Sequence, residues 1–219
     1  MAEPDRGEHV PGAPVLSAPV PERLLAAATR LFAERGFERT SVQDLVGAAG
    51  VTKGAMYHYF SSKDDLLFAI YQRVLAKQMD RLAAYADSGA PLEERLHGAA
   101  ADVVRTTVEH LDDALIFFRS LHMLSADRQA MVRKERRAYH ERFRAMVEEG
   151  RSSGRLRSDI PADIVVNQFF GAVHHLGMWF RADGELSGDD VGRYYADLLL
   201  AALRPQQPGG GGAVPDAGR

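Results

Sequence analysis

The chain of 219 residues contains no cysteine. This absence excludes disulfide bonds, zinc sites built on thiolates and cysteine nucleophiles. An excess of one charge is also missing, because 27 Lys and Arg stand against 30 Asp and Glu, for a formal net charge of −3. General polybasic binding to nucleic acid is therefore excluded, and any such contact must come from a local patch.

Long apolar runs are lacking as well. The most apolar stretch, residues 164–180, contains two amides and the adjacent His174 and His175, and is too polar to span a membrane. The N-terminal segment has no basic region followed by an apolar run, which is the pattern of a signal peptide. We therefore expect a cytoplasmic protein with no membrane partner.

Proline is scarce in the middle of the chain. Of the ten prolines, only Pro91 and Pro161 lie within residues 22–204. Because proline interrupts helices, a proline-poor segment with apolar residues every three to four positions predicts an all-α fold. The two interior prolines suit the first turn of a helix, where the missing N–H has no partner. Residues 1–19 and 205–219 are predicted to be disordered tails, since they cannot bury enough apolar surface to offset ordering entropy.

The apolar periodicity predicts about nine helices. Gly36 and Gly50 are suitable C-caps, whereas Thr52 and Ser62 are suitable N-caps. The expected helices span about 21–35, 42–49, 53–59, 62–87, 91–110, 112–125, 127–153, 161–181 and 187–203.

The most informative segment, residues 40–66, reads TSVQDLVGAAGVTKGAMYHYFSSKDDL. Two short amphipathic helices joined by a tight turn at Gly50 predict a helix-turn-helix. The second helix would begin with Thr52, Lys53 and Gly54. A hydroxyl, an ammonium and bare backbone at this tip can enter a major groove and read base edges.

Five further side chains are candidates for phosphate contacts: Thr40, Ser41, Tyr57, His58 and Lys63. The start of the next helix, at Lys63, also offers free N–H groups that favour a phosphate. Charge adds little support, because residues 21–66 hold six basic and six acidic side chains, although 52–63 has two lysines and no acid. The alternative is an ordinary helical protein in which the aromatic residues of this segment are core residues.

The segment resembles the DNA-binding domain of the TetR family of bacterial transcriptional regulators, whose hallmark is T-x-x-x-I-A-x-x-A-G-V-S-x-G-x-x-Y-x-H-F-x-x-K-x-x-L. The chain supplies the matching residues Thr40 or Ser41, Leu45, Ala49-Gly50-Val51, Thr52, Gly54, Tyr57, Tyr59-Phe60, Lys63 and Leu66. The resemblance implies a DNA-binding domain at 20–66 and a ligand-binding and dimerisation domain at 67–204. It implies a regulator and no enzyme, and we expect a repressor that a small molecule releases from a palindromic operator on double-stranded DNA.

The resemblance also implies a homodimer in which the last two helices of each copy form a four-helix bundle. A dimer is what two half-sites about 34 Å apart require. The sequence permits this bundle through the apolar residues Ile164, Val165, Phe169, Val173, Leu176, Val191, Tyr194, Tyr195, Leu198, Leu199 and Ala201.

A second resemblance concerns the effector. Residues 171–187 resemble a G-x-x-N-W-x-x-x-W-Y-R-P-x-G pattern of TetR-type regulators of lipid, steroid-ring and acyl-CoA catabolism. Trp179, Arg181 and Gly184 match that pattern, although two histidines replace its Asn-Trp. Residues 127–157 carry ten basic against five acidic side chains, which suits the phosphates of coenzyme A but is also typical of a solvated helix face. We expect a small hydrophobic effector, with an acyl-CoA thioester as the second candidate.

Candidate effector contacts are the apolar and amphipathic side chains of the middle helices, for most of which core packing is the alternative. They are Phe68, Tyr71, Thr107, Phe117, Phe118, His122, Met123, Tyr139, Phe143, Phe170, His174 and Trp179. The adjacent His174 and His175 would point about 100° apart on a helix, so no metal site is expected, and no cofactor. Two other classes remain open, which are a helical enzyme or carrier that uses this pocket and a DNA-architectural or protein-interaction module without an effector.

Overall fold

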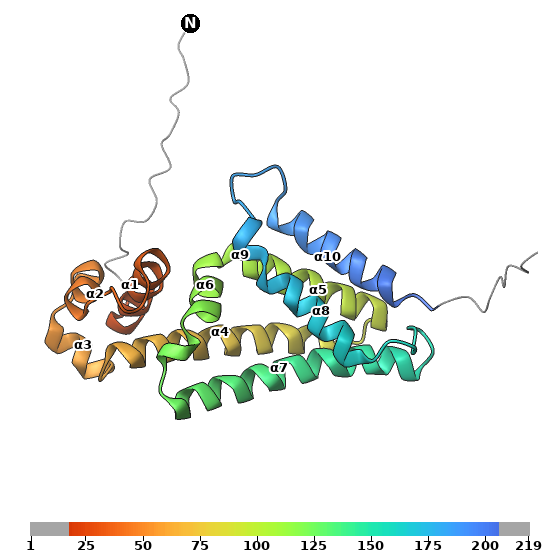
Figure 1. The fold of residues 1–219 in the computed structure, drawn as a ribbon, viewed down its shortest axis with the longest axis horizontal. Helices are drawn as coiled ribbons and strands as arrows, with labels where there is room; N and C mark the ends of the chain where they lie inside the picture. Colours follow the sequence, from red (N-terminus) through yellow and green to blue (C-terminus); the bar gives the residue numbers. More distant parts are fainter. Residues whose placement is uncertain (1–17, 206–219) are drawn as a thin grey trace, which may run out of the picture.

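The computed structural model describes residues 18–205, apart from the side chains of Phe117 and Phe118. The predicted tails at 1–19 and 205–219 lie almost entirely outside the described residues. Within 18–205 the chain is all helical, which confirms the predicted fold class (Figure 1). None of the helices in this range combines the length and the apolar character that crossing a bilayer requires.

The element order follows the predicted one closely, with ten α-helices and one 3-10 turn among the described residues. The helices are α1 (Val20–Arg35), α2 (Val42–Ala49), α3 (Lys53–Tyr59), α4 (Lys63–Ala86), α5 (Leu92–Glu109), α6 (Leu111–Arg119), η1 (Leu121–Met123), α7 (Ala126–Ser152), α8 (Ala162–His174), α9 (Leu176–Trp179) and α10 (Gly188–Leu203).

Two expected helices are divided in the structure. Within the segment expected to be one helix at 161–181, α8 ends at His174 and a separate single turn, α9, follows it. The His175 N–H bonds to the carbonyls of Ala172 and Val173, so the last turn of α8 tightens instead of continuing. No glycine or proline marks this break, and the helical pattern therefore gave no signal for it. The expected helix at 112–125 likewise ends at Arg119, before η1.

The predicted caps Gly36, Gly50, Thr52 and Ser62 are confirmed, and Ser41 is a further N-cap. Ser41 and Asp44 form a reciprocal capping box at the start of α2, while the Thr52 hydroxyl accepts the Ala55 N–H at the start of α3. Gly50 adopts a left-handed conformation, with φ of 62°, at the turn between these two helices. Local side chains thus fix both ends of the α2–α3 corner.

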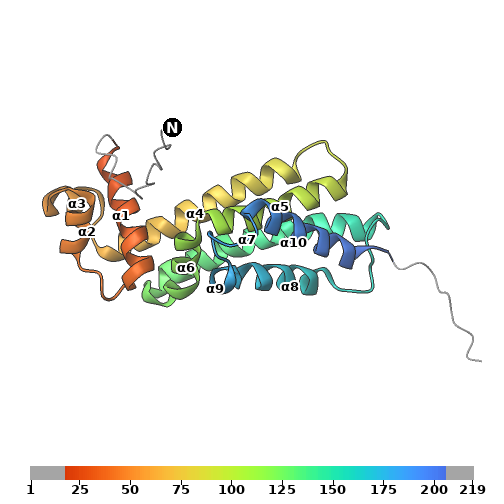
Figure 2. The same ribbon diagram turned by 90° about the horizontal axis from the view of Figure 1, so that it is seen from above.

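Two buried clusters divide the molecule, and α4 belongs to both. One cluster joins α1, α2 and α3 to the first half of α4, up to Leu75, and to residues of α6 and the start of α7. The other joins the end of α4 to α5, the rest of α7, α8 and α10. Figures 1 and 2 show the first three helices at one end and the longer bundle extending away from them along α4. The boundary expected at residue 66 therefore falls within one continuous helix that connects the two parts.

Helix α10 packs closely on α5. A Cβ placed on Gly192 of α10 would lie only 2.7 Å from the carbonyl oxygen of Ala101 in α5, which is closer than any side chain can approach. Glycine therefore allows the two backbones to touch at this point. The remaining faces of α8 and α10 lie on the outside of the bundle.

Candidate functional site

The tip of α3 is exposed on one side, and the other side of the helix is anchored in the core. Met56 is completely buried and anchors the helix, whereas Lys53, Gly54, Tyr57 and His58 are exposed on its other side. The Lys53 ammonium lies 5.9 Å from the centre of the Tyr57 ring. A Cβ on Gly54 would have only the Thr52 hydroxyl within 4 Å, at 3.9 Å, so the surface at this glycine is open to an incoming molecule.

An arginine that sequence reasoning missed ties this corner to α1. The Arg23 guanidinium donates to the carbonyl oxygens of Ala49 and Gly50, at 2.6 and 2.7 Å. These carbonyls end α2, where a positive group is favourable. Arg23 and Gly50 are far apart in the sequence, so only the packing of α1 on α2 brings them together.

The structure places two of the predicted phosphate contacts, Thr40 and Lys63, within the domain. The Thr40 side chain is fully buried, and its hydroxyl donates to Gly36 O at 2.9 Å. The Lys63 ammonium donates to Phe37 O at 2.7 Å and to Thr40 O at 3.0 Å. Both groups hold the loop between α1 and α2 and are engaged within the protein. Ser41 is exposed, although its hydroxyl also bonds to Asp44.

A cavity of about 350 Å³ lies within the larger bundle. Its walls come from α4, α5, α7 and α8, with the start of α6 at one end. Four of the predicted effector contacts line it, namely Thr107, Tyr139, Phe170 and His174. The volume falls at the small end of the range for ligand pockets, and the lining mixes apolar and charged side chains.

The other predicted effector contacts that can be described lie elsewhere. Tyr71 is buried and donates its hydroxyl to Ile116 O at 3.0 Å, and Phe143 is buried with its ring stacked on Phe169. Phe68 lies beneath the guanidinium of Arg128. Three more, outside the cavity lining, are His122, Met123 and the half-exposed Trp179. The predicted contacts Phe117 and Phe118 have side chains outside the described residues.

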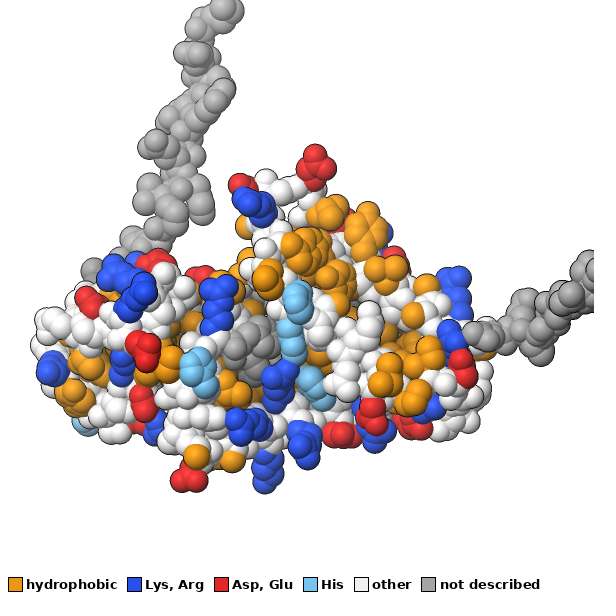
Figure 3. Space-filling model, viewed as in Figure 1, with side chains coloured by type: hydrophobic (Ala, Val, Ile, Leu, Met, Phe, Trp, Pro, Cys, Tyr) orange, Lys and Arg blue, Asp and Glu red, His pale blue; other side chains and the backbone are white. Residues whose placement is uncertain are grey.

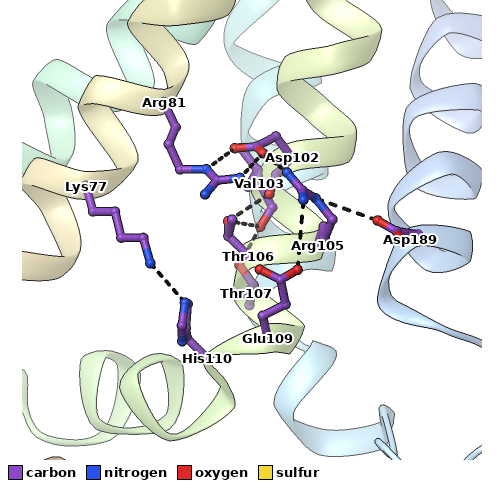
Figure 4. Close-up of polar contacts among 10 residues, drawn as sticks. All are labelled: Lys77, Arg81, Asp102, Val103, Arg105, Thr106, Thr107, Glu109, His110 and Asp189. Carbon is purple, nitrogen blue, oxygen red and sulfur yellow. Dashed lines mark hydrogen bonds and ion pairs between the residues drawn. The ribbon is translucent and has the colours of Figure 1, made fainter. Parts of the chain in front are cut away.

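Most of the polar wall of the cavity was missed from the sequence, although Arg136 lies in the basic segment 127–157 noted there. The wall consists of Arg73, Lys77, Gln78, Arg81, Thr106, His110, Asp113, Arg136 and His140. The wall residues of α4 and α7 lie on helix faces that the apolar pattern predicts to be solvated; Thr106, His110 and Asp113 come from α5, the α5–α6 junction and α6. Figure 4 shows Lys77 and Arg81 reaching from α4 towards α5, and Figure 3 shows basic and histidine side chains gathered on the same side of the molecule.

Ion pairs and histidines occupy much of this wall. The Arg73 guanidinium lies 3.3 Å from Asp113, and the Lys77 ammonium lies 3.0 Å from His110 Nε2. The guanidinium of Arg136 lies 3.1 Å from His174 Nε2. Burial, and then the positive charge of Arg136, lowers the pKa of His174 to about 3. That imidazole is therefore neutral at pH 7 and can accept a hydrogen bond from Arg136.

A charged network continues from the cavity wall to α10. Arg81 of α4 makes two hydrogen bonds to the buried Asp102 of α5, at 2.7 and 2.5 Å. Arg105 donates to the same carboxylate and reaches Asp189, in the first turn of α10, at 3.7 Å (Figure 4). Although burial raises it, the hydrogen bonds from Arg81 and Arg105 hold the pKa of Asp102 below its ordinary value.

An apolar face covers the outside of α8, α9 and α10. Figure 3 shows these side chains grouped at one side of the molecule. Several are more than half exposed, including Met178 at 77%, Leu198 at 68% and Ile164 at 59%. Large grouped apolar side chains are unusual on the surface of a monomer and are typical of a protein interface.

Comparison with known proteins identifies the family. A model described as bacterial regulatory proteins of the tetR family matches residues 24–70, and a tetracyclin repressor-like C-terminal domain model matches 89–203. The HTH-type transcriptional repressor KstR2 of Rhodococcus jostii is 28% identical over 189 residues, covering 82% of this chain and 89% of that protein.

Solved structures agree in fold. The structure of the ketosteroid transcriptional regulator KstR2 of Mycobacterium tuberculosis has a TM-score of 0.78 at 25% identity, covering 89% of this chain and 99% of that one. AibR in complex with isovaleryl coenzyme A and operator DNA has a TM-score of 0.73 at 23% identity, covering 86% of this chain and 100% of that one. Since the C-terminal model alone matches more than half of the residues, the chain belongs to the TetR family of bacterial transcriptional regulators.

Proposed function

We propose that this regulator is a repressor that binds a palindromic operator as a homodimer and is released from it by a small hydrophobic effector. The observation that carries this proposal is the exposed tip of α3, with Thr52, Lys53 and Gly54 held rigidly by the capped α2–α3 corner. The KstR2 relatives are named as transcriptional repressors, which supports repression over activation for this chain.

The tip of α3 supplies the base contacts in this proposal. Thr52, Lys53 and Gly54 enter the major groove, because a short side chain and a glycine allow the backbone to approach the base edges. Ser41, Tyr57 and His58 lie beside them and hold phosphates. Thr40 and Lys63 are left out, since both are engaged within the domain.

The apolar face of α8–α10 pairs with the same face of a second copy. Such a pairing removes Met178, Leu198 and Ile164 from water and places two α3 tips on one side of the dimer. A symmetric dimer binds a symmetric site, which is why the operator is proposed to be palindromic.

The cavity holds the effector, and α4 transmits its presence. This helix lines the cavity and also forms part of the core under α1–α3. An effector that binds better when α4 is displaced changes the spacing of the two tips and weakens operator binding, by about 5- to 150-fold for a coupling of about 1–3 kcal/mol. A coenzyme A thioester is the second candidate effector, favoured by the basic wall; its coenzyme would extend beyond so small a cavity.

Selection from a randomised duplex library on the purified protein tests DNA binding. We expect enriched sequences with two inverted half-sites, and their affinity should fall steeply with salt. Gly54→Leu should abolish the enrichment with the melting temperature unchanged, because the added side chain projects towards the DNA and its Cβ meets only the Thr52 hydroxyl, at an ordinary contact distance. Gly89→Leu, in the loop between α4 and α5, is the matched control and should bind normally.

Two outcomes would contradict the proposal. Enrichment of unrelated sequences, with no repeated half-site, would favour a DNA-architectural protein. Operator binding that no hydrophobic metabolite alters would leave a DNA-binding module without an effector.

A further inference from the structure

The effector cavity has an excess of positive charge. Its lining residues include the four cations Arg73, Lys77, Arg81 and Arg136 but a single carboxylate, that of Asp113. Arg73 and Arg81 each bind a carboxylate, of Asp113 and Asp102 respectively. Lys77 and Arg136 instead contact histidine side chains within the same wall.

Arg136 is the cation of this wall placed deepest among apolar groups. It belongs to α7, one turn before Tyr139 and His140, and its guanidinium reaches His174 of α8. Burial lowers the pKa of Arg136, which means that the charged guanidinium is less favourable here than in water. Burial and the charge of Arg136 also lower the pKa of His140 to about 4, so that His140 and His174 are both neutral at pH 7.

Part of the cavity lining is apolar. Val103, Phe170 and Val173 form it, and the Phe170 ring packs edge-on against Tyr139 at 5.5 Å. The His140 ring stacks on Phe170 at 4.1 Å, so aromatic surface extends directly to the charged wall. The cavity therefore offers an apolar wall and a cation side by side.

We propose that the effector is an anionic amphiphile, and that Arg136 binds its negatively charged group while its hydrocarbon part packs on Val103, Phe170 and Val173. This inference deepens the proposed function, because it assumes that the cavity is the effector site. An anion beside Arg136 restores the favourable environment that burial removes, and the neutral histidines supply hydrogen bonds without competing charge. Lys77, in the same wall, adds a second positive charge.

Four probes with the same hydrocarbon chain test this inference: decanoate, decyl phosphate, decanol and decanoyl coenzyme A. Titration calorimetry on the full-length protein measures their affinities. We expect decanoate or decyl phosphate to bind at least about tenfold more tightly than decanol. A preference for decanoate points to a free acid as the source of the anion, and a preference for decanoyl coenzyme A points to the coenzyme phosphates.

Two variants of α7 separate the role of Arg136 from general charge. Arg136→Met keeps an unbranched apolar stem and should remove the preference for the anionic probes, as should Arg136→Gln. Arg137→Met removes the neighbouring charge, which is exposed and outside the cavity, and should keep the preference. Melting curves of each variant establish that it is folded.

The inference is overturned if decanol binds as tightly as both decanoate and decyl phosphate, if none of the four probes binds, or if folded Arg136→Met keeps the preference for anions. Selection of operator DNA uses the protein without any ligand. A failure of the anionic probes therefore leaves operator binding standing, and a failure of operator binding leaves the ligand preference measurable.

Discussion

Two lysines of the DNA-binding domain show how position decides the role of a residue. Lys53 is exposed at the tip of α3, whereas the ammonium of Lys63 donates to the carbonyls of Phe37 and Thr40 and lies 4.2 Å from the centre of the Phe37 ring. Both lysines stand at the start of a helix, and the sequence predicts a DNA contact for each, to bases for Lys53 and to a phosphate for Lys63. The contacts assign one to the surface and the other to the loop between α1 and α2.

Substituting each lysine by methionine should separate these roles. Lys63→Met should lower the stability of the protein by about 1–3 kcal/mol, because two carbonyl groups lose a charged donor, and should leave the salt dependence of DNA binding unchanged. Lys53→Met should weaken binding to the selected operator more than binding to a scrambled duplex, because Lys53 is proposed to contact base edges, and should change stability by less than about 0.5 kcal/mol. Thermal melting and binding to the two duplexes at several salt concentrations measure both. A reduced slope with normal melting for Lys63→Met would restore its predicted role as a phosphate contact.

The cavity histidines give the protein a dependence on pH. Burial lowers the pKa of His140 to about 4 and of His174 to about 3, from an ordinary value near 6.5. Between these values the unfolded chain binds protons that the folded chain does not, so stability falls as the pH drops below 6.5. The stability that the two neutral histidines contribute is therefore fully present above pH 6.5. The positive charge of Arg136 increases this contribution, because it lowers the pKa of both histidines further.

We expect acidification from pH 7 to pH 5 to destabilise the protein by about 1–2 kcal/mol for each of these histidines, which corresponds to about 2–4 °C in melting temperature per kcal/mol. The double variant with His140→Gln and His174→Gln should lose most of this dependence. His175→Gln, at an exposed neighbouring position, is the control and should keep it. An unchanged pH profile in the double variant would mean that other groups cause the loss.

At the scale of the elements, α4 and α10 are both connected to α5 through one carboxylate. Asp102 is buried and receives hydrogen bonds from Arg81 of α4 and from Arg105, which also reaches the N-terminal turn of α10. A buried carboxylate with two guanidinium partners is costly to disturb, because removing it leaves both charges without their shared acceptor.

Asp102→Asn should therefore destabilise the bundle by about 2–3 kcal/mol. This value is at the lower end for a buried pair, since Arg81 and Arg105 are each about a third exposed. Asp189→Asn is the matched control; Asp189 is 85% exposed and its loss should cost less than about 1 kcal/mol. Denaturant unfolding followed by circular dichroism measures the difference. Equal effects of the two substitutions would show that burial of the network adds nothing.

At the scale of the whole molecule, the proposed dimer rests on the exposed apolar face of α8–α10. This face is distant from the α3 tips along the axis of the bundle, as Figure 1 shows, so pairing through it leaves both tips accessible. The exposed Leu198 and Met178 belong to this face, whereas the exposed Met131 lies on α7, outside it.

Leu198→Glu should convert the dimer into a monomer and weaken binding to a palindromic site by at least about tenfold, because a charge enters an apolar interface and each half-site is then bound alone. Met131→Glu introduces the same charge outside the face and should leave the protein dimeric. Light scattering after size exclusion measures the mass of each variant. A dimeric Leu198→Glu variant with normal operator binding would place the interface elsewhere.

The amino-acid sequence by itself determined the helices, their caps and the family. Apolar periodicity, the capping residues Ser41, Thr52 and Ser62, and the left-handed Gly50 all act over a few residues, so they can be read without knowing how helices pack. The exposed α3 tip followed from the same local pattern. The division between α8 and α9 escaped this reading because no residue with a strong local preference marks it.

Only the tertiary structure decided which polar residues are enclosed. Thr40 and Lys63 turn inward because α4 packs beside the loop after α1, and Arg23 meets Gly50 because α1 crosses the end of α2. Arg136 and the other charged residues of the cavity wall belong to helix faces that look solvated in the sequence. They become the lining of a cavity only when α4, α5, α7 and α8 assemble around them, since contacts between distant helices leave no periodic signal in any one of them.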